Sequence, residues 1–144
     1  MKDSHLLYIE LALLILLFYF AHYSKIFNNL ILSAFFTVGI VGLLWSVYNM
    51  GIRYFSPFPQ PPKKHQLTQK GLYQYMLHPM YTSLMLIGLI LVASNASFQN
   101  FFIYLILIYV LDMKASIEER LLEKMYPEYK AYKQKTKKFI PYLY

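Results

Sequence analysis

Long apolar runs constrain this chain more than any other feature of its sequence. They cover residues 6–23, 30–52, 81–96 and 98–111. At about 1.5 Å per helical residue, the first two runs can cross or nearly cross a hydrocarbon core of about 30 Å. The last two are shorter, and only an uncharged polar turn separates them, so we expect a helical hairpin packed against the first two helices. The sequence predicts an all-α, polytopic membrane protein with four transmembrane helices.

The placement of the basic residues predicts the orientation in the membrane. Of the 14 Lys and Arg residues, Lys25 alone lies between the first two runs and none lies between the last two. The others lie at the N-terminus, in the segment 53–80 and after Leu111. Because positive charge gathers on the cytoplasmic side, we expect both termini in the cytoplasm, with the segments 53–80 and 112–144 on the same face. The basic residues flank apolar runs, which argues against a nucleic-acid partner.

The segment 71–81 joins a basic, proline-containing loop to the third apolar run. Pro79 suits the first turn of a helix and disfavours helical geometry at His78, so His78 is expected at the mouth of a helix that starts near Pro79. Tyr73, Tyr75 and Tyr81 lie at the same level, where an aromatic belt would also place them. Taken alone, the segment fits an ordinary helix start with interfacial anchors as well as it fits a site.

The charged helix after the fourth run, taken alone, also fits an ordinary solvated helix as well as it fits part of a site. The stretch 112–125 has no Gly or Pro, so we expect the fourth helix to continue into the cytoplasm, followed by a helical tail. Lys114 and Glu118 are four residues apart and share one face, as in many solvated helices with an internal ion pair. The chain has no cysteine, and the four histidines have no metal-ligand spacing, so we expect no metal site. These histidines are His5, His22, His65 and His78.

Three residues within the first two runs carry packing predictions. Glu10 is an acid in an apolar run, where it must face protein, water or headgroups. We expect it to reach the nearby interface. Gly39 and Gly42 lie close together in the second run, and small residues let membrane helices approach closely, so they predict a helix-packing face.

The order of several short motifs resembles a known enzyme family. The resemblance covers roughly residues 59–141 and is to the isoprenylcysteine carboxyl methyltransferase family and its small prokaryotic relatives. The chain is similar, more distantly, to the phospholipid N-methyltransferases. The motifs are Leu67-Thr68-x-x-Gly71-x-Tyr73, His78-Pro79-Met80-Tyr81, Glu118-Glu119-Arg120-x-Leu122, Tyr129, Tyr132 and Pro141.

The resemblance implies a site for S-adenosylmethionine between the loop, the His-Pro helix start and the Glu-Glu helix. By position, the implied cofactor-binding residues are His65, Gln66, Leu67, Thr68, Tyr73, His78, Pro79, Met80, Tyr81 and Glu118. Lys114 falls where the prenylcysteine enzymes carry an arginine that faces the substrate carboxylate, so it is the implied substrate-binding residue. We assign no catalytic residue, because in-line methyl transfer from a sulfonium needs positioning and desolvation more than acid–base groups.

These features together predict an S-adenosylmethionine-dependent methyltransferase. Its acceptor is expected to be small and lipophilic or membrane-associated, with a carboxylate, an amine or a thiol as the methylated group. The alternatives are a non-catalytic membrane protein that retains the fold and a sterol-reductase-like oxidoreductase. We expect a single domain over residues 1–144, with two leading helices in 1–52 and the loop, hairpin and tail in 53–144. It is expected in the prokaryotic cytoplasmic membrane as a multi-pass protein.

Overall fold

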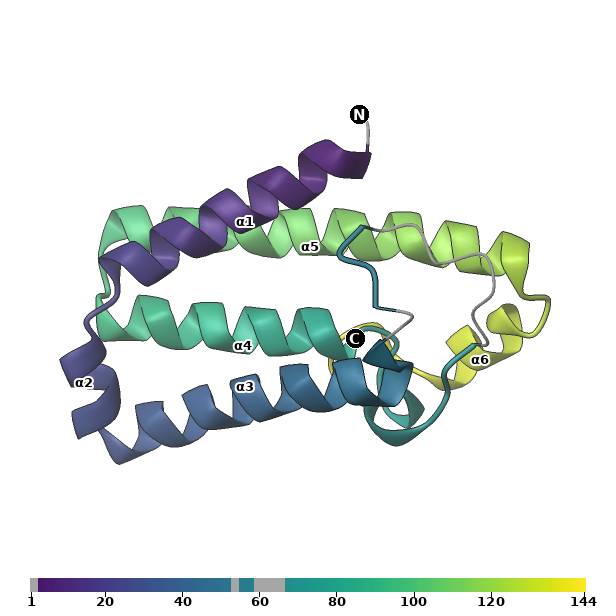
Figure 1. The fold of residues 1–144 in the computed structure, drawn as a ribbon, viewed down its shortest axis with the longest axis horizontal. Coiled ribbons are helices and arrows are strands. Elements are labelled where there is room, and N and C mark those ends of the chain that lie inside the picture. The colour runs from purple at the N-terminus through teal and green to yellow at the C-terminus, as the bar shows by residue number, and fades with distance from the viewer. Residues whose placement is uncertain (1–2, 53–54, 59–66) are drawn as a thin grey trace.

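The described part of the chain is a bundle of helices, as the all-α prediction requires. The computed structural model describes residues 3–52, 55–58 and 67–144. Figure 1 shows four long helices lying alongside one another, with α4 in the centre of the view. These helices are α1 (Asp3–Phe20), α3 (Leu30–Met50), α4 (Pro79–Ser94) and α5 (Phe98–Met125). Three short elements join them or follow them: α2 (Tyr23–Asn28), the 3-10 helix η2 (Gly71–Gln74) and α6 (Tyr129–Lys135).

The helix ends follow local capping chemistry. Pro79 occupies the first turn of α4, as predicted, and His78 before it has the non-helical angles φ −127° and ψ 63°. The side chain of Ser97 caps α5 by accepting a hydrogen bond of 3.2 Å from the backbone N–H of Asn100. This cap ends the tight turn between α4 and α5 and produces the predicted hairpin. The helix α5 then continues to Met125, which confirms the predicted extension beyond Leu111.

The connection between α1 and α3 differs from the prediction. A short loop is expected around Lys25, Asn28 and Asn29, but the structure has the helix α2 over Tyr23–Asn28. Ile26 in this helix is fully buried in the main hydrophobic core, and this packing stabilises a short helix of six residues there. The loop prediction was wrong for Lys25 and Asn28, whereas Asn29 lies between the two helices as predicted.

The predicted packing face of the second run is confirmed. A Cβ atom at Gly39 would lie 2.7 Å from Cγ1 of Ile87, and one at Gly42 would lie 2.8 Å from Oγ of Ser83. Both contacts are far shorter than van der Waals distances, so only glycine lets α3 approach α4 this closely. The close approach places the C-terminal end of α3 beside the start of α4.

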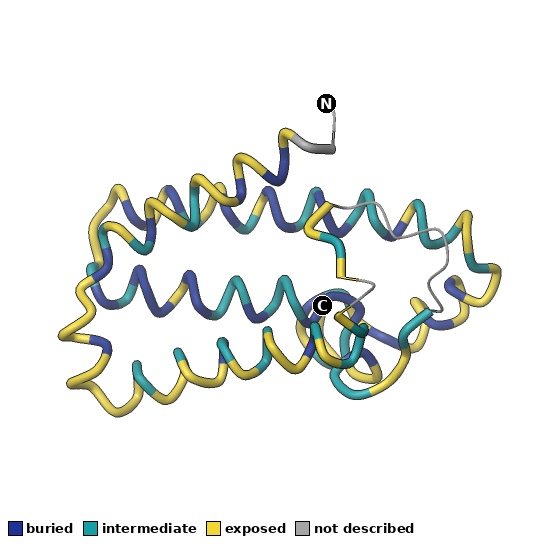
Figure 2. Tube along the Cα trace, in the orientation of Figure 1, coloured by how far each residue is buried: buried dark blue, intermediate teal, exposed yellow. Residues whose placement is uncertain are grey.

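Within the described residues, two helices are long and apolar enough to cross a membrane. They are α3, with a mean hydropathy of 2.2, and α5, with 1.6, whereas α1 and α4 are apolar but shorter. Only 11% of the most apolar window of α3 is buried, and Figure 2 shows most of this helix exposed or half-buried. An exposed apolar surface of this extent is typical of a contact with lipid or with another protein.

One end of the bundle gathers segments that are distant in sequence. The start of α1, the end of α3, the start of α4, η2, α6 and the C-terminus lie at this end, opposite α2 (Figure 1). The C-terminal segment is fastened to the start of α4: the N–H of Leu77 donates to the carbonyl of Lys137 at 2.8 Å, and that of His78 donates to Lys138 at 3.1 Å. The hydroxyl of Thr82 also donates to the carbonyl of Phe139, at 2.9 Å.

Candidate functional site

A cavity of about 270 Å³ lies at this end of the bundle. Its volume is close to the lower limit for small-molecule sites, and its walls come from every long helix together with η2 and α6. Its apolar lining includes Leu7, Leu11, Leu14, Leu43, Met50, Phe55, Pro57, Phe58, Leu67, Leu77, Met80, Leu84 and Leu122. Its polar and aromatic lining includes Glu10, Ser56, Thr68, Tyr73, His78, Tyr81, Lys114, Glu118, Tyr129 and Tyr132.

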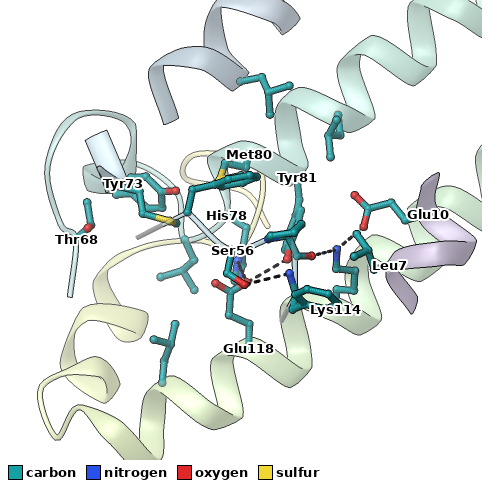
Figure 3. A pocket seen from close by; sticks show the side chains of 18 of the residues that line it. Leu7, Glu10, Ser56, Thr68, Tyr73, His78, Met80, Tyr81, Lys114 and Glu118 are labelled. Carbon is teal, nitrogen blue, oxygen red and sulfur yellow. Dashed lines mark hydrogen bonds and ion pairs between the residues drawn. The ribbon is translucent and has the colours of Figure 1, made fainter. Parts of the chain in front are cut away.

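The cavity has a polar arm and an apolar arm. In Figure 3, Thr68 and Tyr73 lie on one side, Leu7 and Glu10 lie on the other, and His78 lies between them. We call the part of the lining that comes from the 67–81 segment, from α6 and from Glu118 and Leu122 of α5 the polar arm. The apolar arm runs between α1, α3 and α4, and its lining includes Leu11, Leu14, Leu43 and Leu84. The lining of the cavity therefore offers both polar and apolar surface to a ligand.

His78 is held between two carboxylates at the start of α4. Its Nε2 lies 3.1 Å from Oε1 of Glu119, and its Nδ1 lies 3.7 Å from Oε2 of Glu118. The ring is buried and stacks on Tyr81, with ring centroids 5.5 Å apart and planes at 20°. The imidazole is therefore fixed in place by protein groups on both edges and on one face.

The two adjacent glutamates have different surroundings. Glu119 is held by His78 and by the ammonium of Lys133 at 2.7 Å, and only 7% of its side chain is exposed. The hydrogen bond to Glu119 raises the pKa of Lys133, so that lysine stays charged. Glu118 accepts a hydrogen bond from the hydroxyl of Tyr81 at 3.2 Å, lines the cavity, and keeps 21% of its side chain exposed. Glu118 is thus the carboxylate of the pair that a ligand can reach.

The cavity is also lined by three tyrosines from η2 and α6, which are Tyr73, Tyr129 and Tyr132. The hydroxyl of Tyr132 donates to the backbone carbonyl of Tyr73, which ties α6 to η2. The hydroxyl of Tyr129 is buried and has no hydrogen-bond partner among the described residues. Burial raises the pKa of Tyr129 far above its ordinary value, so the group is a neutral phenol that can donate a hydrogen bond. A buried polar group without a partner is rare in native proteins, so the Tyr129 hydroxyl keeps an unused hydrogen bond among the described residues.

Glu10 and Lys114 form a buried ion pair between α1 and α5. Only 7% and 2% of their side chains are exposed, and the lysine ammonium also donates to the carbonyl of Pro57 at 3.0 Å. The expectation that Glu10 reaches the membrane interface was wrong. The physical reason is that a lysine on a neighbouring helix neutralises it inside the protein, which costs less than leaving a lone carboxylate in an apolar run.

The cavity brings together most of the residues that the sequence singles out. Its lining includes Leu67, Thr68, Tyr73, His78, Met80, Tyr81, Lys114 and Glu118. Pro79 is buried in the first turn of α4, next to the lining but outside it. His65 and Gln66 lie outside the described residues, so their predicted role in cofactor binding is a sequence-based prediction only.

Sequence reasoning assigned no role at the site to Glu10, Tyr129 or Tyr132. Glu10 carries the clearest signal, because it is the one charged residue within the run 6–23. Tyr129 and Tyr132 belong to the motif order that produces the family resemblance, which is a weaker signal. Among the described residues, no group of three or more His, Cys, Asp or Glu side chains is placed to hold a metal ion.

Comparison with known proteins identifies the family. The phospholipid methyltransferase family model matches residues 27–129, which include α3, η2, α4, α5 and most of the cavity lining. No curated protein and no solved structure matches the chain. The family match confirms the relationship to membrane methyltransferases that the motif order predicts. The chain belongs to the phospholipid methyltransferase family.

Proposed function

We propose that this protein is an integral membrane enzyme that transfers a methyl group from S-adenosylmethionine to a lipophilic acceptor. The family supports a methyltransferase of lipid-related substrates. The observation that carries the proposal is the polar arm of the cavity, where an accessible carboxylate, Glu118, and an unpartnered buried hydroxyl, Tyr129, line the same space. The carboxylate suits a positively charged or hydrogen-bond-donating group of a ligand, and the hydroxyl suits a hydrogen-bond acceptor of the same ligand.

The residues of the polar arm fit this cofactor. S-adenosylmethionine, when bound, supplies an electrophilic methyl group on a sulfonium. Glu118 would accept hydrogen bonds from the ammonium or the ribose hydroxyls, and Tyr129 would donate one to a cofactor oxygen. The rings of Tyr73 and Tyr81 also line the arm, and aromatic faces attract cations such as a sulfonium. The described lining carries two carboxylates and one ammonium, so its charge balance favours a cationic ligand.

The remaining groups of the polar arm orient and dehydrate the site. Glu119 contacts His78 and is itself paired with Lys133. The C-terminal segment covers the turn before α4, because the backbone N–H groups of Leu77 and His78 donate hydrogen bonds to it. A covered, preorganised site favours methyl transfer because the reacting groups are held in line and water is excluded. We assign no proton-transfer role to any side chain.

The apolar arm is the proposed place of the acceptor tail. Leu11, Leu14 and Leu43 line it from α1 and α3, and the Glu10–Lys114 pair lies near the point where it meets the polar arm. Lys114 is therefore placed near the head group of an acceptor, as the sequence resemblance implies. The methylated group of the proposed acceptor is a carboxylate, an amine or a thiol.

The arrangement of the helices supports a four-span topology. All four long helices lie alongside one another, and the segments after residue 67 and after residue 125 lie at the same end of the bundle (Figure 1). We propose that α1 and α4 span the membrane together with α3 and α5, with both termini and the polar arm on the cytoplasmic side. Residues 1–144 would then form one domain of a multi-pass protein in the prokaryotic cytoplasmic membrane.

Binding of the reaction product tests the proposed function. Detergent-solubilised protein is titrated by calorimetry with S-adenosylhomocysteine and, separately, with NADPH. We expect saturable binding of S-adenosylhomocysteine and none of NADPH. Binding of NADPH alone would instead support a sterol-reductase-like oxidoreductase, and binding of neither would support a non-catalytic membrane protein with this fold.

A further inference from the structure

We call the part of the cavity lined by the buried ion pair between Glu10 and Lys114 the junction, because Glu10 is followed on α1 by Leu11 and Leu14 of the apolar arm and Lys114 is followed on α5 by Glu118 of the polar arm. Glu10 comes from α1, which lies before residues 27–129 that match the family, and Lys114 comes from α5, which lies within them. Both side chains line the cavity, and both are almost fully buried. A charged pair in this position determines which head groups can approach the end of the apolar arm.

The ammonium of Lys114 is already satisfied by protein groups. It donates to the carboxylate of Glu10 and, at 3.0 Å, to the carbonyl of Pro57, and it lies 5.4 Å from the ring centroid of Tyr81. A lysine has three N–H donors, so the two hydrogen bonds leave one donor, and the charge of Lys114 is already balanced by Glu10. An anionic head group could bind Lys114 only by displacing Glu10, whose buried carboxylate would then lose its counter-ion.

The other charges near the junction disfavour an anion as well. Glu118 lies one helical turn beyond Lys114 on α5 and also lines the cavity. The described lining therefore presents two carboxylates and one lysine that is already paired. A third carboxylate brought in by an acceptor would meet like charge at short range in a poorly hydrated site, which costs several kcal/mol in an interface.

We propose that Glu10 is a specificity-determining residue that neutralises Lys114, so that the site selects acceptors with an uncharged or cationic head group over carboxylates. The proposal rests on the proposed function, because it takes this cavity as the acceptor site. It replaces the role of Lys114 as a carboxylate contact with a role as the partner of Glu10. In this view Glu10 acts through Lys114. Removing the charge of Glu10 shifts the preference of the site toward anions, and removing the charge of Lys114 shifts it toward cations.

Binding of two matched amphiphiles tests the proposal without any methyl transfer. Decanoate and decyltrimethylammonium have similar tails and opposite permanent charges at neutral pH. Their dissociation constants are measured on detergent-solubilised wild type, Glu10→Gln, Lys114→Met and the double variant. Partition of each probe into micelles is the same for every protein, so it cancels when a variant is compared with the wild type.

The two single variants are expected to shift in opposite directions. Glu10→Gln frees the ammonium of Lys114, and we expect it to bind decanoate about tenfold more tightly, the scale of a hydrogen bond to a charged group. Lys114→Met frees the carboxylate of Glu10, and we expect it to bind decyltrimethylammonium about tenfold more tightly. The double variant has neither charge, and its ratio of affinities is expected to stay near that of the wild type.

Two results would overturn the proposal. The first is unchanged affinity for both probes in both single variants, which would make the pair purely structural. The second is a loss of decanoate binding in Lys114→Met and in the double variant, which would show that Lys114 already binds anions in the wild type. If one single variant fails to fold, the other and the double variant still decide between these results. Failure of the wild type to bind S-adenosylhomocysteine would contradict the proposed function. The amphiphile affinities would still show whether Glu10 neutralises Lys114.

Discussion

Replacing Glu118 with glutamine tests the proposed role of this carboxylate in cofactor binding. The substitution keeps the size of the side chain and keeps an oxygen that can accept the hydrogen bond from Tyr81, which is 3.2 Å long in the structure. His78 retains its closer partner Glu119 at 3.1 Å. We therefore expect the fold to tolerate Glu118→Gln, with a change in the free energy of unfolding of no more than about 1 kcal/mol.

The expected loss of affinity follows from the exposure of the group. A hydrogen bond to a charged partner contributes about 1.5–3 kcal/mol. Because 21% of the Glu118 side chain is exposed, water weakens such an interaction, and we take the lower half of that range. A loss of about 1.5–2 kcal/mol corresponds to a dissociation constant for S-adenosylhomocysteine that rises roughly 10–30-fold.

Calorimetry on the detergent-solubilised protein measures this effect against a matched control. Glu128→Gln makes the same chemical change at an exposed position at the start of α6, where the side chain caps no backbone group. We expect Glu128→Gln to bind S-adenosylhomocysteine as the wild type does. Equal affinities for the two variants would refute the reasoning, because Glu118 would then behave as a solvated residue of an ordinary helix.

Three further predictions test the cavity wall, the helix packing and the topology. Tyr129→Phe removes a buried hydroxyl without a partner among the described residues, so thermal unfolding should show equal or higher stability while affinity for S-adenosylhomocysteine falls about threefold to tenfold. Weaker binding together with lower stability would contradict this. Gly39→Leu should destabilise the bundle by about 1–3 kcal/mol in denaturant unfolding, because its Cβ would lie 2.7 Å from Ile87, and unchanged stability would contradict the close packing of α3 on α4. Single cysteines at Asn95 and Lys130 should react with a membrane-impermeant maleimide from opposite sides of the membrane, since the chain has no native cysteine, and labelling from one side would contradict the four-span proposal.

The local features of the fold could be predicted because each depends on residues that are close in sequence. Pro79 determines the start of α4 through its fixed φ angle, and Ser97 caps α5 within one turn. Gly39 and Gly42 are one turn apart, so their packing role is visible in the sequence. In each case a single residue type has one strong conformational or steric consequence, and the structure follows it.

The partner of Glu10 could not be predicted from the sequence. Glu10 and Lys114 are separated by 104 residues, and from Leu6 onward α1 is apolar on all sides apart from Glu10. A helix without a polar face gives no sign of which side it turns toward its neighbours. The sequence indicated that Glu10 faces protein, water or headgroups, and only the packing of α1 on α5 shows that it pairs with Lys114 inside the protein.

The remaining differences have similar causes. The helix α2 is six residues long, which is too short for its apolar periodicity to be recognised. Tyr129 and Tyr132 reach the cavity because the chain turns back after Met125 and packs α6 against Leu77 and Leu67. This reversal depends on tertiary contacts between distant segments, so the sequence indicated the two tyrosines as a motif without showing where they lie.

Transfer of a labelled methyl group tests the central claim most directly. Purified protein in lipid–detergent micelles is incubated with S-adenosylmethionine that carries a tritiated methyl group, and the lipids are then extracted into organic solvent. We predict that tritium accumulates in the organic phase with time and with protein concentration, and that Glu118→Gln lowers the rate while Glu128→Gln does not. The experiment is repeated with lipids that carry an amine, a thiol or a carboxylate. If the tritium in the organic phase stays at the level of a protein-free control with all three, the assignment of this protein as a lipid methyltransferase is contradicted.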